Sequence, residues 1–261
     1  MHKRGQITVF IILGILIITI LGIVFYLYQD KLKINQNPEF DFSKTEVVKN
    51  YVEGCIEKVG NEALTKLGNQ GGLINPLSYQ NWNCILPGNC NKVSYVCYTT
   101  EYARCYYKRS SIKEDAIKEA ELYLKGELNS CLNFQNIRSQ GYEIETGNLK
   151  LNLTLGLYST NINLDYPITI KGKSSEVKIN KFSKNFNIPL GRLINVAEDL
   201  TDQAINNPQG VVNYQSYVNF QEGEIQIERH SYRDTDIYIT KLRGNPYKFQ
   251  FAIQTYVSQF P

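Results

Sequence analysis

The feature that most constrains this chain is an uncharged, apolar run near its N-terminus, which extends from Ile7 to Tyr28. As a helix, this run would be about 33 Å long at a rise of about 1.5 Å per residue, whereas a bilayer's hydrocarbon core is about 30 Å thick. Lys3 and Arg4 precede the run, and no acidic residue does. The run therefore predicts a hydrophobic helix over residues 6–28 that crosses a membrane, with its N-terminus in the cytoplasm.

Three kinds of N-terminal segment contain such a run. A cleaved secretory signal has a shorter apolar core of about 7–15 residues, followed by small residues, so this run is too long for one. A plain membrane anchor needs only the run itself. The third kind is indicated by Lys3-Arg4-Gly5-Gln6, which lies directly before the run.

These four residues and the apolar run resemble the class III signal peptide of archaeal type IV pilins. The resemblance implies a peptidase that cuts between Gly5 and Gln6, with residues 1–5 as a basic leader. It also implies that the hydrophobic helices leave the membrane and bundle into a filament core. The chain departs from the family's pattern at Phe10, where many members have glutamate.

The cysteines all lie beyond the apolar run. They are Cys55, Cys84, Cys90, Cys97, Cys105 and Cys131. An even number on one side of a membrane segment is typical of disulfides in an oxidising compartment. Zinc is the alternative, but the spacings include no C-x2-C pair, and the nearest histidines are His2 and His230. We therefore expect disulfides and no metal site.

The spacing of the cysteines favours particular pairs without excluding crossed ones. Cys84 and Cys90 flank a turn, and Cys97 and Cys105 lie in a tyrosine-rich stretch that is typical of a hairpin. Cys55 and Cys131 fall on two predicted helices, so a bridge between them is expected if those helices pack together. Both could also be small buried residues.

After a polar linker at residues 29–42, residues 43–261 predict an α+β ectodomain. Its first helix is expected to begin with a capping box at Ser43 and Glu46 and to end at Gly68, and its second begins with a capping box at Ser111 and Glu114. A third helix covers residues 190–206. Strands with period two are expected at residues 150–158, 162–170, 177–188, 224–228, 236–242 and 247–257. Their pattern predicts an antiparallel sheet with helices on one face.

Residues 70–110 form a cysteine- and tyrosine-rich insert in this scheme. The insert has no periodic apolar face, so we expect it to bury little and to depend on disulfides for its order. The segments Tyr51-Val-Glu-Gly-Cys-Ile-Glu, Leu67-Gly-Asn-Gln-Gly-Gly and Asn129-Ser-Cys-Leu resemble a family of mostly uncharacterised surface proteins from small-genomed symbiotic archaea. That resemblance implies a location at the cell surface.

The sequence contains no catalytic constellation. His230 is the sole histidine outside the leader and lies among polar residues, so we interpret it as a surface residue. Asp234 and Asp236 suit a turn better than a calcium site. We therefore expect no enzymatic activity, no cofactor and no metal. The net charge of +3 without a dense basic block predicts no binding to nucleic acid.

Asn152 begins the single N-x-S/T sequon and is a candidate for glycosylation.

Two functions are consistent with these features. The first is a structural subunit of an extracellular type IV pilin-like filament, a homo-oligomer assembled through the segment from Ile7 to Tyr28. The alternative is a single-pass adhesin or receptor that binds a partner cell surface through the insert at residues 70–110. The expected location is accordingly the cell membrane, with a cytoplasmic N-terminus, or an extracellular filament.

Overall fold

A computed structural model describes residues 14, 16–23, 44–86, 88–100, 103–173, 175–207, 211–221 and 223–255. Contacts divide the chain into two units, Met1–Phe42 and Ser43–Pro261. The predicted leader at residues 1–5, the proposed cleavage site at Gly5 and Gln6, and the linker at residues 29–42 lie outside the described residues.

The prediction of a long hydrophobic helix over residues 6–28 was wrong. The helix described in the first unit is short, at residues 16–23, and would extend about 12 Å at a rise of about 1.5 Å per residue. Among the described residues, no helix has the length and apolar character needed to cross a membrane. The run is rich in β-branched residues and contains Gly14 and Gly22, and both kinds of residue lower helix propensity.

The second unit contains a four-stranded antiparallel sheet. Its strands are β4 (Glu143–Thr146), β5 (Lys150–Leu155), β6 (Thr160–Lys171) and β7 (Glu176–Phe186). One edge of β6 pairs with β7, and the other pairs with β5 and then with β4. The predicted alternation is present, since Leu153, Ile162 and Leu164 are buried on one face.

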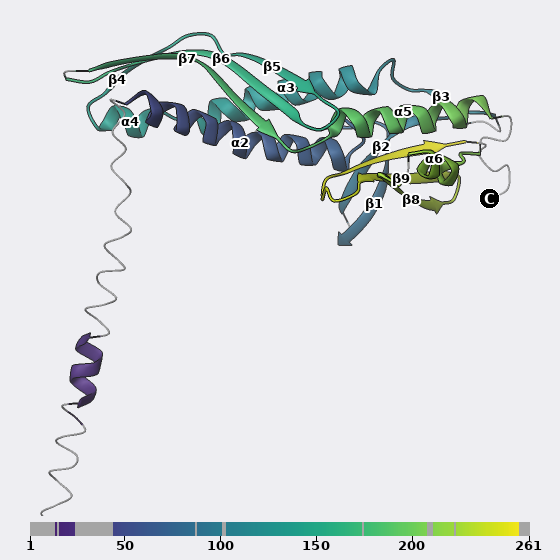
Figure 1. Ribbon diagram of the computed structural model, residues 1–261, viewed down its shortest axis with the longest axis horizontal. Coiled ribbons are helices and arrows are strands. Elements are labelled where there is room, and N and C mark those ends of the chain that lie inside the picture. The colour runs from purple at the N-terminus through teal and green to yellow at the C-terminus, as the bar shows by residue number, and fades with distance from the viewer. Residues whose placement is uncertain are drawn as a thin grey trace, which may run out of the picture. The chain divides into compact units, whose positions relative to one another are not determined.

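Two long helices pack against this sheet (Figure 1). They are α2 (Thr45–Asn69), which contacts β7, and α3 (Ile112–Cys131), which contacts β5. The predicted cap of α3 is confirmed, because the Ser111 hydroxyl accepts a hydrogen bond from the Glu114 N–H at 3.1 Å. A short helix, α4 (Gln135–Ser139), follows α3.

The ends of α2 differ from the prediction. Its N-cap is Lys44, which makes no side-chain capping bond, and Ser43 lies outside the described residues. At the other end, Gly68 is still helical, the helix ends at Asn69, and Gly71 follows the C-cap with a φ of 68°. The Gly72 N–H donates to the Leu67 carbonyl oxygen at 2.8 Å, which completes a Schellman motif.

A second sheet of six strands has the order β1-β2-β10-β9-β8, with β3 paired to β2. Its strands are β1 (Tyr79–Leu86), β2 (Asn89–Tyr98), β3 (Tyr106–Tyr107), β8 (Ile225–Tyr232), β9 (Thr235–Leu242) and β10 (Lys248–Gln254). The pair β2–β10 is parallel, so the prediction of a single antiparallel sheet was also wrong. Parallel strands need a long connection, and here most of the chain lies between the two.

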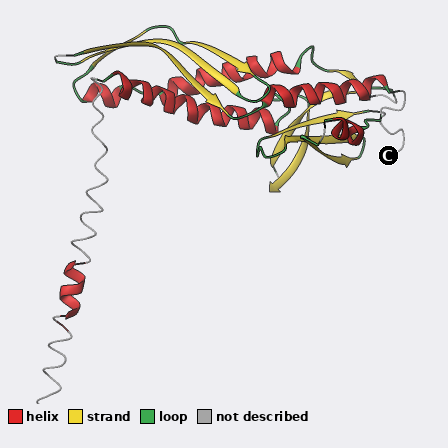
Figure 2. Ribbon diagram, in the orientation of Figure 1, coloured by secondary structure: helices red, strands yellow, loops and turns green. Residues whose placement is uncertain are grey.

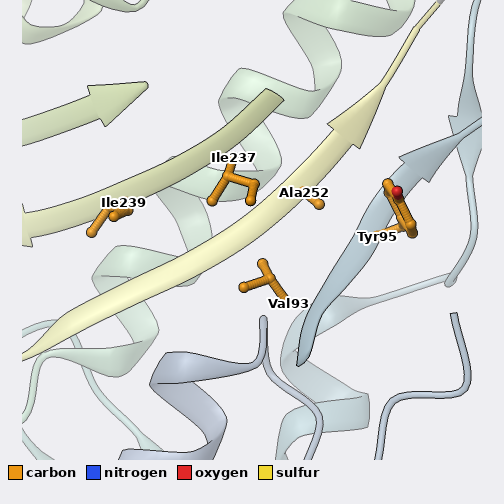
Figure 3. Packing of buried hydrophobic residues seen from close by; sticks show 5 residues of the cluster. All are labelled: Val93, Tyr95, Ile237, Ile239 and Ala252. Atoms are coloured by element: carbon orange, nitrogen blue, oxygen red, sulfur yellow. The ribbon is translucent and has the colours of Figure 1, made fainter. Parts of the chain in front are cut away.

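The expected insert at residues 70–110 proves to be part of a hydrophobic core. Val93 and Tyr95 of β2 are buried against Ile237 and Ile239 of β9 and Ala252 of β10 (Figure 3). The helix α5 (Leu190–Asn206) has the predicted bounds and contacts β9 and β10, whereas α6 (Tyr214–Phe220) contacts β8. Figure 2 shows these helices beside the strands of the second sheet. Sequence patterns missed α4, α6, β1 and β4.

Replacing Gly68 by alanine tests the role of this glycine. An added Cβ would lie 2.5 Å from the Lys248 carbonyl oxygen and 2.7 Å from the Tyr247 hydroxyl, so we expect the unfolding free energy to fall by about 1–3 kcal/mol. Gly54→Ala in the same helix is the matched control, because nothing lies within 4 Å of its added Cβ. Helix propensity should make that control more stable by up to about 1 kcal/mol. Urea denaturation measures both changes, and a stabilised Gly68→Ala would contradict the packing.

Candidate functional site

Three disulfides brace the second unit, and all six cysteines take part. Cys55–Cys131 joins α2 to α3 with a Cα–Cα distance of 5.8 Å, Cys84–Cys90 joins β1 to β2, and Cys97–Cys105 joins β2 to the residue before β3. These are the pairs that the sequence favoured. Such bridges are typical of proteins that mature in an oxidising compartment.

The disulfide Cys84–Cys90 closes the outer half of the β1–β2 hairpin. Regular pairing runs from Tyr79 opposite Ser94 to Trp82 opposite Asn91, and then the register shifts. Asn83 lies at this shift with a φ of 49°. Leu86 pairs with Asn89 next to the turn, where Gly88 has a φ of 88° that favours glycine. The disulfide and the last pair therefore restrict residues 84–86 and 88–90, which we call the hairpin apex.

The hairpin apex exposes two large aliphatic side chains. Ile85 is 80% exposed and Leu86 is 64% exposed. Figure 1 shows the end of β1 projecting beyond the other strands of its sheet. Within residues 77–100, Lys92 is the single charged residue. Other turns of this sheet have charged side chains, such as Arg233 and Asp234 between β8 and β9. The apex is therefore apolar by composition and by exposure.

Aromatic contacts hold the base of this hairpin. Trp82 packs against the core cluster shown in Figure 3, and its ring centroid lies 4.9 Å from that of His230. Lys92 Nζ lies 5.0 Å from the centroid of the Tyr79 ring. Because β1 and β8 are the two edges of the sheet, the contact between Trp82 and His230 shows that the sheet curls until its edges approach.

His230 has no arrangement typical of a catalytic base. Its imidazole is partly exposed, with Nε2 3.8 Å from a carboxylate oxygen of Glu228, and that carboxylate also binds Lys241 Nζ at 2.9 Å. Asp236, considered above for calcium, forms an ion pair with Arg229 at 2.9 Å. Among the residues that the structure describes, no three His, Cys, Asp or Glu side chains are grouped as metal ligands would be.

A concave region lies on the four-stranded sheet. Register places Lys150, Asp165 and Lys181 in one polar row and Asn152, Asn163 and Ser183 in another, two residues along the strands. Both rows line a pocket of about 490 Å³. The sequon residues Asn152 and Thr154 are exposed, and the Thr154 hydroxyl donates to Asn152 Oδ1 at 3.4 Å. Glycosylation at Asn152 stays a prediction.

Another hollow, of about 370 Å³, lies at the start of α3 and contains a buried arginine. Arg109 Nη2 donates to the Gly71 carbonyl oxygen at 2.7 Å, and burial lowers the pKa of its guanidinium. Burial, together with the charges of Asp199 and Asp202, raises the pKa of Glu198. Because these groups hold α3, α5 and the loop after α2 together, we interpret the hollow as structural.

Comparison of the chain with known protein families, with curated proteins and with solved structures found no match. Geometry alone therefore identifies the candidate site, and the hairpin apex is its most distinctive feature among the described residues. Its cysteines were identified from the sequence, but its strand β1 was not. The Pro87-Gly88 turn between two polar-aromatic stretches was the signal that could have revealed the hairpin.

The loop lengths predict how much each disulfide stabilises the unit. Cys55–Cys131 spans 76 residues and Cys84–Cys90 spans 6. A chain-entropy argument gives about 4 kcal/mol for the long loop and about 2 kcal/mol for the short one. Paired Cys→Ser variants of each bridge, compared by urea denaturation, should show this order. The reverse order would mean that the bridges act mainly through the native state.

Glycosylation at Asn152 has a direct test by intact-mass spectrometry. In cells that N-glycosylate extracytoplasmic proteins, the full chain should have excess mass, which both Asn152→Gln and Thr154→Ala should remove. Asn163→Gln, in the same polar row but outside a sequon, is the matched control and should retain the excess. A wild-type chain at its unmodified mass would count against the prediction.

Proposed function

We propose that this chain is an extracellular binding protein of the adhesin or receptor type, which attaches to a partner cell surface through the hairpin apex. The observation that carries the proposal is the exposure of Ile85 and Leu86 at the end of a disulfide-closed hairpin. Two adjacent aliphatic side chains on a projecting turn contribute nothing to the chain's own core. Their burial on a partner would gain about 1.5–3 kcal/mol each.

The disulfides support both the location and the mode of binding. An oxidising compartment is the usual setting for three bridges in a chain of this size. The Cys84–Cys90 bridge also limits the conformations of the apex before it meets a partner, which reduces the entropy lost on binding. A rigid, apolar projection is thus suited to contact with another surface.

The filament subunit, which was the other function expected from the sequence, stays a prediction. It rests on residues 7–28, and most of them lie outside the described residues. The contacts of the β1–β2 hairpin do not bear on self-assembly through that segment. We therefore base the proposed function on the hairpin alone.

Attachment of coated beads to cells tests the proposed function. Beads coated with the full chain should bind cells of the source culture, and the double variant Ile85→Ser, Leu86→Ser should lower binding by about tenfold or more, equivalent to about 1.4 kcal/mol. Leu77→Ser is the matched control, because Leu77 is 99% exposed but precedes β1, at the strand end away from the apex.

Both variants replace exposed side chains, so their thermal unfolding and non-reducing gel mobility should equal those of the wild type. Equal attachment by the wild type and the double variant would rule out the apex as the binding surface. A comparable loss in Leu77→Ser would point to general surface hydrophobicity rather than to a defined site.

A further inference from the structure

We propose that the partner of the hairpin apex is the lipid surface of a membrane, into which Ile85 and Leu86 insert. This inference rests on the proposed function and adds the chemistry of the partner. The apex has the three features that interfacial insertion needs: aliphatic side chains at the end, aromatic side chains farther back, and no acidic group.

The end of the hairpin is aliphatic. Ile85 and Leu86 are exposed and adjacent, and the Cys84–Cys90 bridge keeps them at the turn. Backbone groups entering a membrane interface need hydrogen-bond partners, because hydrocarbon supplies none. Here the pairing of Leu86 with Asn89 provides such partners next to the turn. The apex can therefore enter the boundary of the acyl chains with part of its backbone already paired.

The aromatic residues lie at a suitable distance behind the end. Trp82 precedes Ile85 by three residues, which corresponds to roughly 10 Å along a strand. Tryptophan and tyrosine concentrate at the level of the headgroups, because their rings are amphipathic. With Ile85 and Leu86 in the acyl boundary, Trp82 lies near the level of the headgroups.

Charge distinguishes a lipid partner from a protein partner. Residues 77–100 contain no carboxylate, and their single charge is the Lys92 ammonium, which lies beside the Tyr79 ring. An acidic group would be repelled by anionic headgroups, whereas a lysine near the surface is attracted to them. The polar side chains that flank the aliphatic end, exposed Asn81, Asn83 and Asn89, are uncharged. No fixed negative charge of this hairpin therefore opposes contact with anionic headgroups.

The chain provides its own probe for the test, since Trp82 is its one tryptophan. The full chain is mixed with vesicles of an equimolar mixture of phosphatidylcholine and phosphatidylglycerol, whose acyl chains are brominated or unmodified. Bromine quenches tryptophan emission at short range. The difference between brominated and unmodified vesicles therefore reports whether Trp82, and with it the hairpin, comes close to the acyl chains.

We expect brominated vesicles to quench the emission of the wild type and of Leu77→Ser to the same extent. In the double variant Ile85→Ser, Leu86→Ser, the lipid concentration needed for half-maximal quenching should rise by about tenfold or more. Unchanged thermal unfolding shows that this variant is folded.

Absence of quenching in the wild type, or equal quenching in the double variant, would overturn the lipid assignment. The bead experiment then separates the two proposals. Cell attachment that still depends on Ile85 and Leu86 would leave the proposed function standing with a protein partner. Loss of both effects would remove the proposed function as well.

Discussion

The close approach of α2 to both sheets is the contact on which the second unit depends. Near its middle, Gly60 faces Phe186 and Ile162 of the four-stranded sheet, where an added Cβ would lie 2.5 Å from the Phe186 ring. Near its end, Gly68 meets the Lys248 carbonyl oxygen, and the Tyr247 hydroxyl donates to the Leu64 carbonyl oxygen at 2.6 Å. One helix with two small residues thus joins two sheets that share no strand pair in the part of the chain that the structure describes.

Local rules predicted the elements whose signals are local. The Ser111 capping box starts α3, and the apolar stripe of α5 has the bounds that its period predicts. Gly68 shows the limit of local sequence rules. A glycine near the end of a helix predicts that the helix ends there, but Gly68 lies inside α2. Its actual role is close packing against β10, a strand about 180 residues later in the chain, and nothing in the flanking sequence indicates that neighbour.

The disulfide of the candidate site could be predicted from the sequence, but its strand pairing and its exposed side chains could not. Cysteine spacing indicated the bridge that closes the apex, whereas the pairing of β1 with β2 includes a shift near Asn83 that hides the period of the strand. The parallel pair β2–β10 joins segments from opposite ends of the unit, which no pattern within either segment specifies. Likewise, the apolar run over residues 7–28 predicts an apolar environment but not the length of a helix. Its β-branched residues and glycines lower the helix propensity.

The curl of the six-stranded sheet affects how readily copies of this protein associate through their strand edges. Unpaired strand edges are templates on which neighbouring molecules can add strands and aggregate. Here the contact between Trp82 and His230 brings the two edge strands together, and the irregular register of β1 interrupts the flat edge that strand addition requires. Copies of the second unit are therefore less prone to add strands to one another when they are concentrated.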